Sequence, residues 1–175
     1  MSQWGTYGIA ISALAVLVFG GATVSGIRLN ISSSMPRGLW IEHAVPAQVH
    51  RGDVVAACLE PSETLKYYVG PGDCQNTSLE PVIKPIVAVA GDTVAITETG
   101  VVVNGSPIRH SARLSRDGHG RSMAVLFPPR IEGAVVVPPG FVWLVAPMDE
   151  SFDSRYLGPV RTSSIIAIAD PLLVE

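Results

Sequence analysis

Three polar islands interrupt an otherwise apolar chain, and they hold the side chains that could do chemistry. The first is the run Ser32-Ser33-Ser34-Met35-Pro36, and the second is Lys84, alone in an apolar stretch. The third is the polar run 149–156, which contains Ser151, Asp153 and Arg155. A serine hydroxyl becomes a nucleophile when a base takes its proton, and a lysine is such a base when burial lowers its pKa. The chain therefore holds the parts of a Ser–Lys hydrolase.

Each island also has an ordinary structural interpretation. A serine-rich run is often a spacer, a lysine in a strand often extends its stem to water, and an Asp–Arg cluster is often a surface turn. The two cysteines are too few and too far apart for a zinc site. The histidines show no metal or triad spacing and are interpreted as surface residues: His43, His50, His110 and His119. The sequence therefore predicts no metal and no cofactor.

A long apolar segment opens the chain and would place these islands next to a membrane. No charged residue and no histidine occurs before Arg28, and Tyr7–Ile27 is almost wholly apolar. About 20 apolar residues in a helix cross the roughly 30 Å hydrocarbon core of a bilayer. We predict a membrane anchor over residues 1–28 and a folded domain over residues 29–175. A cleaved signal peptide and a buried core helix are the alternatives.

Composition excludes two classes of protein. Only 15% of the 175 residues are charged, against about 25% in an average soluble protein, and the mean hydropathy is +0.37. These values exclude a disordered charged chain. Lysine and arginine number 12 against 15 acidic residues, so no basic excess exists to neutralise phosphates. We therefore predict no nucleic-acid partner.

After the anchor, the pattern is that of short strands and turns. Asn104-Gly105 between two extended runs is a strong hairpin signal, and Pro85 indicates an edge or a bulge in its strand. The polar stretch 109–121 is expected to be a solvent loop. These features predict a mainly β fold, an antiparallel β domain behind one N-terminal transmembrane helix. The predicted strands are Trp40–Ala44, Gly52–Leu59, Val82–Ala90, Thr93–Thr97, Val101–Val103, Ser106–Ile108, Ala134–Val137, Phe141–Ala146 and Ser164–Ala169.

The cysteines and the charges that flank the predicted span give opposite indications of the side of the membrane on which the folded domain lies. Cys58 and Cys74 lie in a turn-rich stretch, where they form either a disulfide or two buried free thiols. A disulfide would suit an oxidising compartment. Arg28 and Arg37 follow the predicted span and would weakly place this side in the cytoplasm.

The three islands resemble, in order, the conserved boxes of the type I signal peptidases. Ser32-x-Ser34-Met35-Pro36 resembles the nucleophile box, with one residue fewer before the proline. Lys84 precedes Asp92 of a Gly-Asp turn by 92 − 84 = 8 residues, as in the lysine box. The run 151–159 resembles the last box almost residue for residue. The short chain, the single anchor and the run 34–40 look most like the TraF-type conjugative transfer peptidases.

The resemblance implies a signal peptidase-like β domain that acts as a serine endopeptidase without a cofactor. Ser34 would be the nucleophile and Lys84 the general base. The Ser32 hydroxyl and the Ser34 backbone N–H would form the oxyanion hole, whose donors are each worth about 10²–10³ in rate. Ser151 would hydrogen-bond to the lysine and orient it. Asp153 and Arg155 would form an ion pair that holds the last box.

The resemblance also implies a substrate and a location. The domain would face the periplasm from the bacterial inner membrane, with the lipid bilayer and a membrane-inserted pilin or signal-peptide precursor as partners. The acyl-enzyme would pass its acyl group to water or to an amine that closes a ring. Two alternatives stay open: a general type I signal peptidase, and a non-catalytic membrane-anchored β scaffold of a secretion complex.

Overall fold

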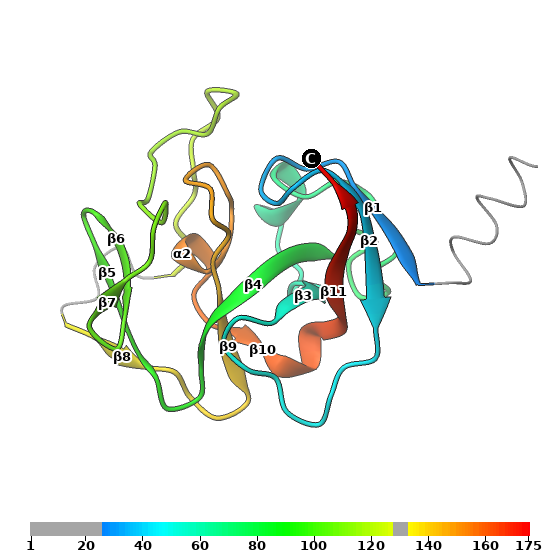
Figure 1. The fold of residues 1–175 in the computed structure, drawn as a ribbon. Helices are drawn as coiled ribbons and strands as arrows, with labels where there is room; N and C mark the ends of the chain where they lie inside the picture. Colours follow the sequence, from blue (N-terminus) through cyan, green and yellow to red (C-terminus); the bar gives the residue numbers. More distant parts are fainter. Residues whose placement is uncertain (1–25, 128–132) are drawn as a thin grey trace, which may run out of the picture.

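The computed structural model describes residues 26–127 and 133–175, and strands dominate this part of the chain (Figure 1). A seven-stranded sheet has the order β1-β2-β11-β3-β4-β9-β10, and a four-stranded sheet has the order β7-β6-β5-β8. All the strand pairs are antiparallel. The prediction of a mainly β, antiparallel fold is therefore confirmed for the described residues.

The larger sheet contains β1 (Ile27–Asn30), β2 (Gly38–His43), β3 (Val54–Ala57), β4 (Val82–Val89), β9 (Phe141–Leu144), β10 (Val160–Arg161) and β11 (Ile165–Val174). The smaller sheet contains β5 (Thr93–Thr97), β6 (Gly100–Val103), β7 (Ser106–Pro107) and β8 (Val135–Val136). The described residues also form three short helices: η1 (Leu65–Tyr67), α2 (Ser154–Leu157) and η2 (Thr162–Ser164). All nine strands expected from the sequence are present, with ends that differ by a few residues. β1 and β10 were not expected.

The predicted N-terminal anchor lies mostly outside the described residues. Ile27 and Arg28, which the sequence assigned to its last turn, instead begin β1, where they pair with Ile41 and Trp40. The folded domain therefore starts slightly earlier than residue 29, because these residues pair their backbone groups with β2. Within 26–127 and 133–175, no helix has the length and apolar character needed to cross a membrane.

β4 carries Lys84 through the interior of the larger sheet. It pairs with β3 on one side and with β9 on the other, so Pro85 does not mark an edge strand. The alternative expectation, a bulge, matches the register shift between Ile86 and Ala88. Because successive side chains point to opposite faces of a strand, Lys84 shares a face with the buried Ile86, whereas the bulge places Ala88, which pairs with Trp143, on the other face.

A hydrophobic cluster joins the two parts of the chain that carry the first two polar islands. Met35 packs there with Trp40, Ile83, Ala146 and Ala169, all of them buried. Burial of a side chain such as methionine is worth about 1.5–3 kcal/mol. This cluster therefore holds the serine-rich segment against β4 at a fixed position.

Two local features of the fold correspond to sequence signals. Asn104 and Gly105 have φ angles of 48° and 79°, and they form the tight turn between β6 and β7. Cys58 and Cys74 are joined in a disulfide, so the interpretation as two free thiols is wrong. The disulfide ties the end of β3 to the segment that leads back to β4.

Candidate active site

The first polar island forms a loop between two paired strands. Residues 31–37, here called the serine loop, connect β1 to β2, and the ladder closes at the pair Asn30–Gly38. Gly38 has a φ of +132°, and a Cβ at this position would overlap the carbonyl oxygen of Leu173 in β11. A glycine is therefore required where the loop re-enters the sheet.

The structure places Ser34 and Lys84 in direct contact. Lys84 Nζ donates a hydrogen bond to Ser34 Oγ at 2.6 Å and a second to the Ile83 carbonyl at 3.1 Å. Only 5% of the Lys84 surface is exposed. The lysine therefore does not extend to water. It ends beside a hydroxyl supplied by a different part of the chain.

The surroundings of Lys84 favour its uncharged form. Burial lowers the pKa of Lys84 to about 8, because a charged amine loses hydration inside the protein. Asp153 and Glu80 act in the opposite direction through their negative charges, whereas the positive charge of Arg155 lowers this pKa further. Lys84 is therefore suited to take a proton near neutral pH.

Ser32 lies on the other side of Ser34. The two hydroxyl oxygens are 3.1 Å apart, and Ser32 Oγ donates to Asn30 Oδ1 at 2.8 Å. Ser32 therefore lies next to the nucleophile candidate, where an oxyanion donor is needed. Asn30 was not among the residues that the sequence pointed to.

The hydrogen bond expected between Ser151 and Lys84 is not formed. Ser151 is 3% exposed, and its Oγ has no hydrogen-bond partner among the described residues. The hydrogen bonds of Lys84 go to Ser34 and to the Ile83 carbonyl instead. Ser151 nevertheless lines the same cleft as Lys84, so it belongs to the site without orienting the lysine in this structure.

Asp153 and Arg155 form the expected ion pair, deep inside the protein. Arg155 Nε and Nη2 each lie 2.8 Å from one carboxylate oxygen of Asp153, and both side chains are at most 1% exposed. The interpretation of this run as a surface turn is therefore wrong. Asp153 also accepts from the Ala146 N–H at 2.9 Å, which fastens the last box to the end of β9.

Arg155 has a further structural task. Its Nη1 and Nη2 groups share their hydrogens among five backbone carbonyls, those of His110, Ala112, Met148, Asp149 and Ser151. One guanidinium thus satisfies several acceptors that would otherwise be buried without partners. The ion pair therefore fixes both the polar run 149–156 and the start of the neighbouring loop.

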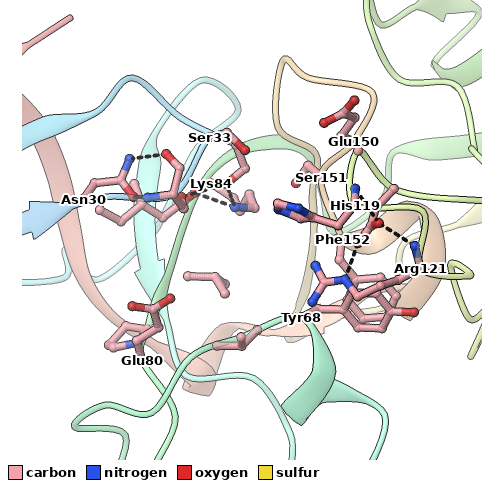
Figure 2. A pocket seen from close by; sticks show the side chains of 18 of the residues that line it. Asn30, Ser33, Tyr68, Glu80, Lys84, His119, Arg121, Glu150, Ser151 and Phe152 are labelled. Atoms are coloured by element: carbon pink, nitrogen blue, oxygen red, sulfur yellow. Dashed lines mark hydrogen bonds and ion pairs between the residues drawn. The ribbon is translucent and has the colours of Figure 1, made fainter.

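A cleft of about 170 Å³ is lined by Asn30, Ser32, Ser34, Lys84 and Ser151, whereas Asp153 and Arg155 lie buried behind it (Figure 2). Figure 2 shows Lys84 in the middle of the cleft, Asn30 and Glu80 on one side, and Tyr68 and Phe152 on the other. Within the described ranges, no group of three or more His, Cys, Asp or Glu residues is placed to hold a metal ion.

The loop expected to face only solvent contributes one wall of this cleft. Asp117 Oδ1 accepts from the backbone N–H groups of His119 and Arg121 at 2.9 and 2.8 Å. Arg121 also donates to the Tyr67 carbonyl at 2.6 Å. The loop tip is therefore docked, and the side chain of His119 lines the cleft (Figure 2).

Sequence reasoning missed several residues of the site. Asn30, Glu80 and His119 line the cleft but lie in no recognisable motif, and Glu150 lines it from the third polar island, where it was not singled out. Asn30 gave one usable signal, since asparagine is depleted in strands and this one directly precedes the serine-rich run. Glu80 and His119 come into the site only through the fold.

Comparison with known proteins places this geometry in a family. The family model for signal peptidase, peptidase S26, matches residues 2–173. The conjugal transfer protein TraF of Agrobacterium fabrum is 34% identical over 173 residues, which cover 94% of each chain. The plasmid transfer protein TraF of Escherichia coli is 33% identical over 166 residues, 91% of this chain and 89% of the relative.

A solved signal peptidase I from Enterococcus faecalis is similar to 69% of this chain and to 96% of its own, with 22% identity and a TM-score of 0.40. The family model and the relatives both cover almost the whole chain. The chain therefore belongs to the peptidase S26 family of signal peptidases, and it is similar over nearly its full length to TraF conjugal transfer proteins.

Proposed function

We propose that this protein is a membrane-anchored serine endopeptidase that uses a Ser34–Lys84 dyad to process a precursor for conjugative transfer. One observation carries the proposal: the buried amine of Lys84 lies 2.6 Å from Ser34 Oγ. A nucleophile and a base within hydrogen-bond reach are the minimum for acyl transfer by a serine.

The reaction begins when Lys84 is uncharged. The contact then reverses, and the Ser34 hydroxyl donates its proton to Nζ. Ser34 Oγ attacks the carbonyl carbon of the scissile bond, and the proton moves to Lys84. The resulting ammonium passes this proton to the leaving amine, which leaves an acyl-enzyme on Ser34. Water, deprotonated by the same lysine, then releases the product and restores Ser34.

The negative charge on the carbonyl oxygen is stabilised from the serine loop. The backbone N–H of Ser34 supplies one donor and the Ser32 hydroxyl the other. Ser32 lies 3.1 Å from the nucleophile oxygen, which supports this assignment. Each donor lowers the barrier because it points at charge that develops in the transition state.

The relatives and the disulfide support a proposed substrate and location. The TraF relatives are named for conjugal and plasmid transfer, so the proposed substrate is a membrane-inserted pilin precursor. A retained anchor in the apolar segment that precedes β1 would hold the cleft at the bilayer surface and raise the effective substrate concentration. The Cys58–Cys74 disulfide supports the oxidising periplasmic side of the inner membrane.

The test uses the full-length chain in membranes together with a pilin precursor. Ser34→Ala and Lys84→Ala are each expected to abolish maturation of the precursor, as followed by mass spectrometry. Ser106→Ala and Lys66→Ala serve as matched controls, because both residues are exposed and lie outside the cleft. Normal maturation with either of the first two variants overturns the dyad.

The same assay separates the remaining alternatives. A secretory preprotein is supplied in parallel with the pilin precursor. Cleavage of the preprotein at a comparable rate would identify a general signal peptidase. Cleavage of neither substrate by the unsubstituted protein would favour a non-catalytic scaffold and contradict the proposal.

A further inference from the structure

Asn30 lies at the base of the serine loop and contacts both of its limbs. It is the last residue of β1 and is only 8% exposed. Its side-chain Nδ2 donates to the carbonyl oxygens of Met35 at 3.1 Å and Pro36 at 2.9 Å. Its Oδ1 accepts from the Ser32 backbone N–H at 3.2 Å and from Ser32 Oγ at 2.8 Å. One amide therefore bridges the loop from inside.

The chemistry of these partners fixes which way the amide points. Met35 and Pro36 offer carbonyl oxygens, which only accept, so the NH₂ group must face them. The Ser32 N–H only donates, so the amide oxygen must face it. A carboxylate has no donor for the two carbonyls, and a hydroxyl is too short to serve both limbs. The position therefore requires a group that donates and accepts at opposite ends.

The same amide sets the direction of the hydrogen bonds around the nucleophile. Because Asn30 Oδ1 cannot donate, the Ser32 hydroxyl must donate to it. Ser32 Oγ then has its lone pairs free, and it accepts from the hydroxyl of Ser34 at 3.1 Å. Lys84 completes the chain by donating to Ser34 Oγ at 2.6 Å. The hydrogen bonds therefore run in one direction along four side chains, from the donor Lys84 through Ser34 and Ser32 to the acceptor Asn30.

We infer that Asn30 is a positioning residue for the proposed peptidase reaction, acting through Ser32. It holds the Ser32 side chain 3.1 Å from Ser34 Oγ in the resting protein, and in the reaction the Ser32 hydroxyl turns its proton from Asn30 Oδ1 to the oxyanion. This inference rests on the proposed function. It adds a residue whose effect on the rate comes from placing another side chain.

The serine loop keeps other anchors when Asn30 is removed. Trp40 Nε1 also donates to the Pro36 carbonyl at 3.1 Å, and Met35 remains packed in its buried cluster. The fold is therefore expected to survive Asn30→Ala. The Ser32 hydroxyl loses its fixed partner, and its position relative to Ser34 becomes less defined.

The experiment measures kcat and KM on a peptide that spans the cleavage site of the pilin precursor. Asn30→Ala is expected to lower kcat by about 10²-fold, as for loss of one oxyanion donor, with KM changed less than about threefold. Asn76→Ala is the matched control, since Asn76 is exposed and makes one long hydrogen bond, to the Leu59 carbonyl at 3.4 Å. This control is expected to leave both constants unchanged.

A double-mutant cycle with Ser32→Ala separates positioning from a general loss of structure. If Asn30 acts through Ser32, Asn30→Ala lowers kcat less than about threefold in the Ser32→Ala background. Independent losses that multiply in the double variant overturn the inference. A lowered melting temperature with an unchanged kcat per folded molecule would also overturn the inference.

Failure of the inference can be told apart from failure of the proposed function. Ser34→Ala and Lys84→Ala are measured on the same peptide. If both abolish cleavage while Asn30→Ala does not lower kcat, only the positioning role is wrong. If either retains cleavage, the dyad itself is wrong.

Discussion

Lys84 Nζ and Ser34 Oγ are 2.6 Å apart although fifty residues separate them in the chain. The hydroxyl comes from a loop between β1 and β2, and the amine comes from the middle of β4. Neither side chain can be placed by local structure alone. The contact is therefore a product of the packing between these two regions, and it is sensitive to changes in either.

The pH dependence of kcat is expected to report Lys84. Since the base must be uncharged, activity should rise with pH and reach half its maximum near pH 8, where Lys84 titrates. The carboxylate of Glu80 raises the pKa of Lys84, so Glu80→Gln should shift this midpoint to lower pH. Rate–pH profiles of the two proteins on the same peptide check both statements.

Glu63→Gln is the control for this experiment, because Glu63 is exposed, pairs with Lys66 and lies outside the cleft. Its profile should coincide with that of the unsubstituted protein. A rate that stays constant between pH 6 and 9 would contradict a lysine base. An upward shift in Glu80→Gln would contradict the electrostatic argument.

Ser32→Ala is expected to lower kcat by about 10²–10³-fold with little change in KM, because an oxyanion donor acts in the transition state. Ser32→Thr retains the hydroxyl and should keep most of the activity. Steady-state kinetics on the precursor peptide distinguish the two variants. Equal rates for Ser32→Ala and the unsubstituted protein would remove Ser32 from the mechanism.

Arg155→Met is expected to destabilise the fold by about 3–5 kcal/mol, since it leaves the buried Asp153 carboxylate without its partner. Arg161→Met removes an exposed ion pair with Glu60 and should cost less than about 1 kcal/mol. Urea unfolding of both variants gives the comparison. Similar midpoints for the two would show that the buried pair is not a major source of stability.

Reduction of the Cys58–Cys74 disulfide should destabilise the protein by about 3 kcal/mol. The bond closes a loop with a sequence separation of 16, and loops of this length gain stability of that size from a cross-link. Cys58→Ser with Cys74→Ser should give the same loss without reductant. Thiol titration of the denatured, unreduced protein should find no free thiol. Two titratable thiols would be inconsistent with the bond.

Much of the fold could be predicted from short-range patterns. Strands such as Thr93–Thr97 follow from β-branched residues next to Gly-Asp or Asn-Gly turns, and the structure has that strand with the same ends. Pro85 was harder to interpret. Whether an interior strand can contain a proline depends on how both neighbouring strands are offset from it. That offset is a property of the assembled sheet.

The candidate site was predictable where a motif carried it. Ser34 and Lys84 stood out because each interrupts an apolar or membrane-adjacent stretch in a recognisable pattern. Asn30 and His119 did not, since their places in the site depend on side-chain hydrogen bonds and on docking of a loop. Ser151 lies where the motif implied, but the expected hydrogen bond is missing because Lys84 donates to other acceptors.

The order of strands in the larger sheet bears on the reacting atoms themselves. Three strands, β2, β11 and β3, lie between β1 and β4. Neighbouring strands are about 4.8 Å apart, so β1 and β4 would be about 19 Å apart in a flat sheet. β11 has register shifts at two points along its pairings, and such irregularities bend a strand. Bending of this kind, together with the position of the serine loop beyond the end of β1, accounts for the 2.6 Å between the Ser34 hydroxyl and the Lys84 amine. A distant substitution that straightened β11 would separate these two groups and abolish the proposed activity, while every side chain of the cleft stayed intact.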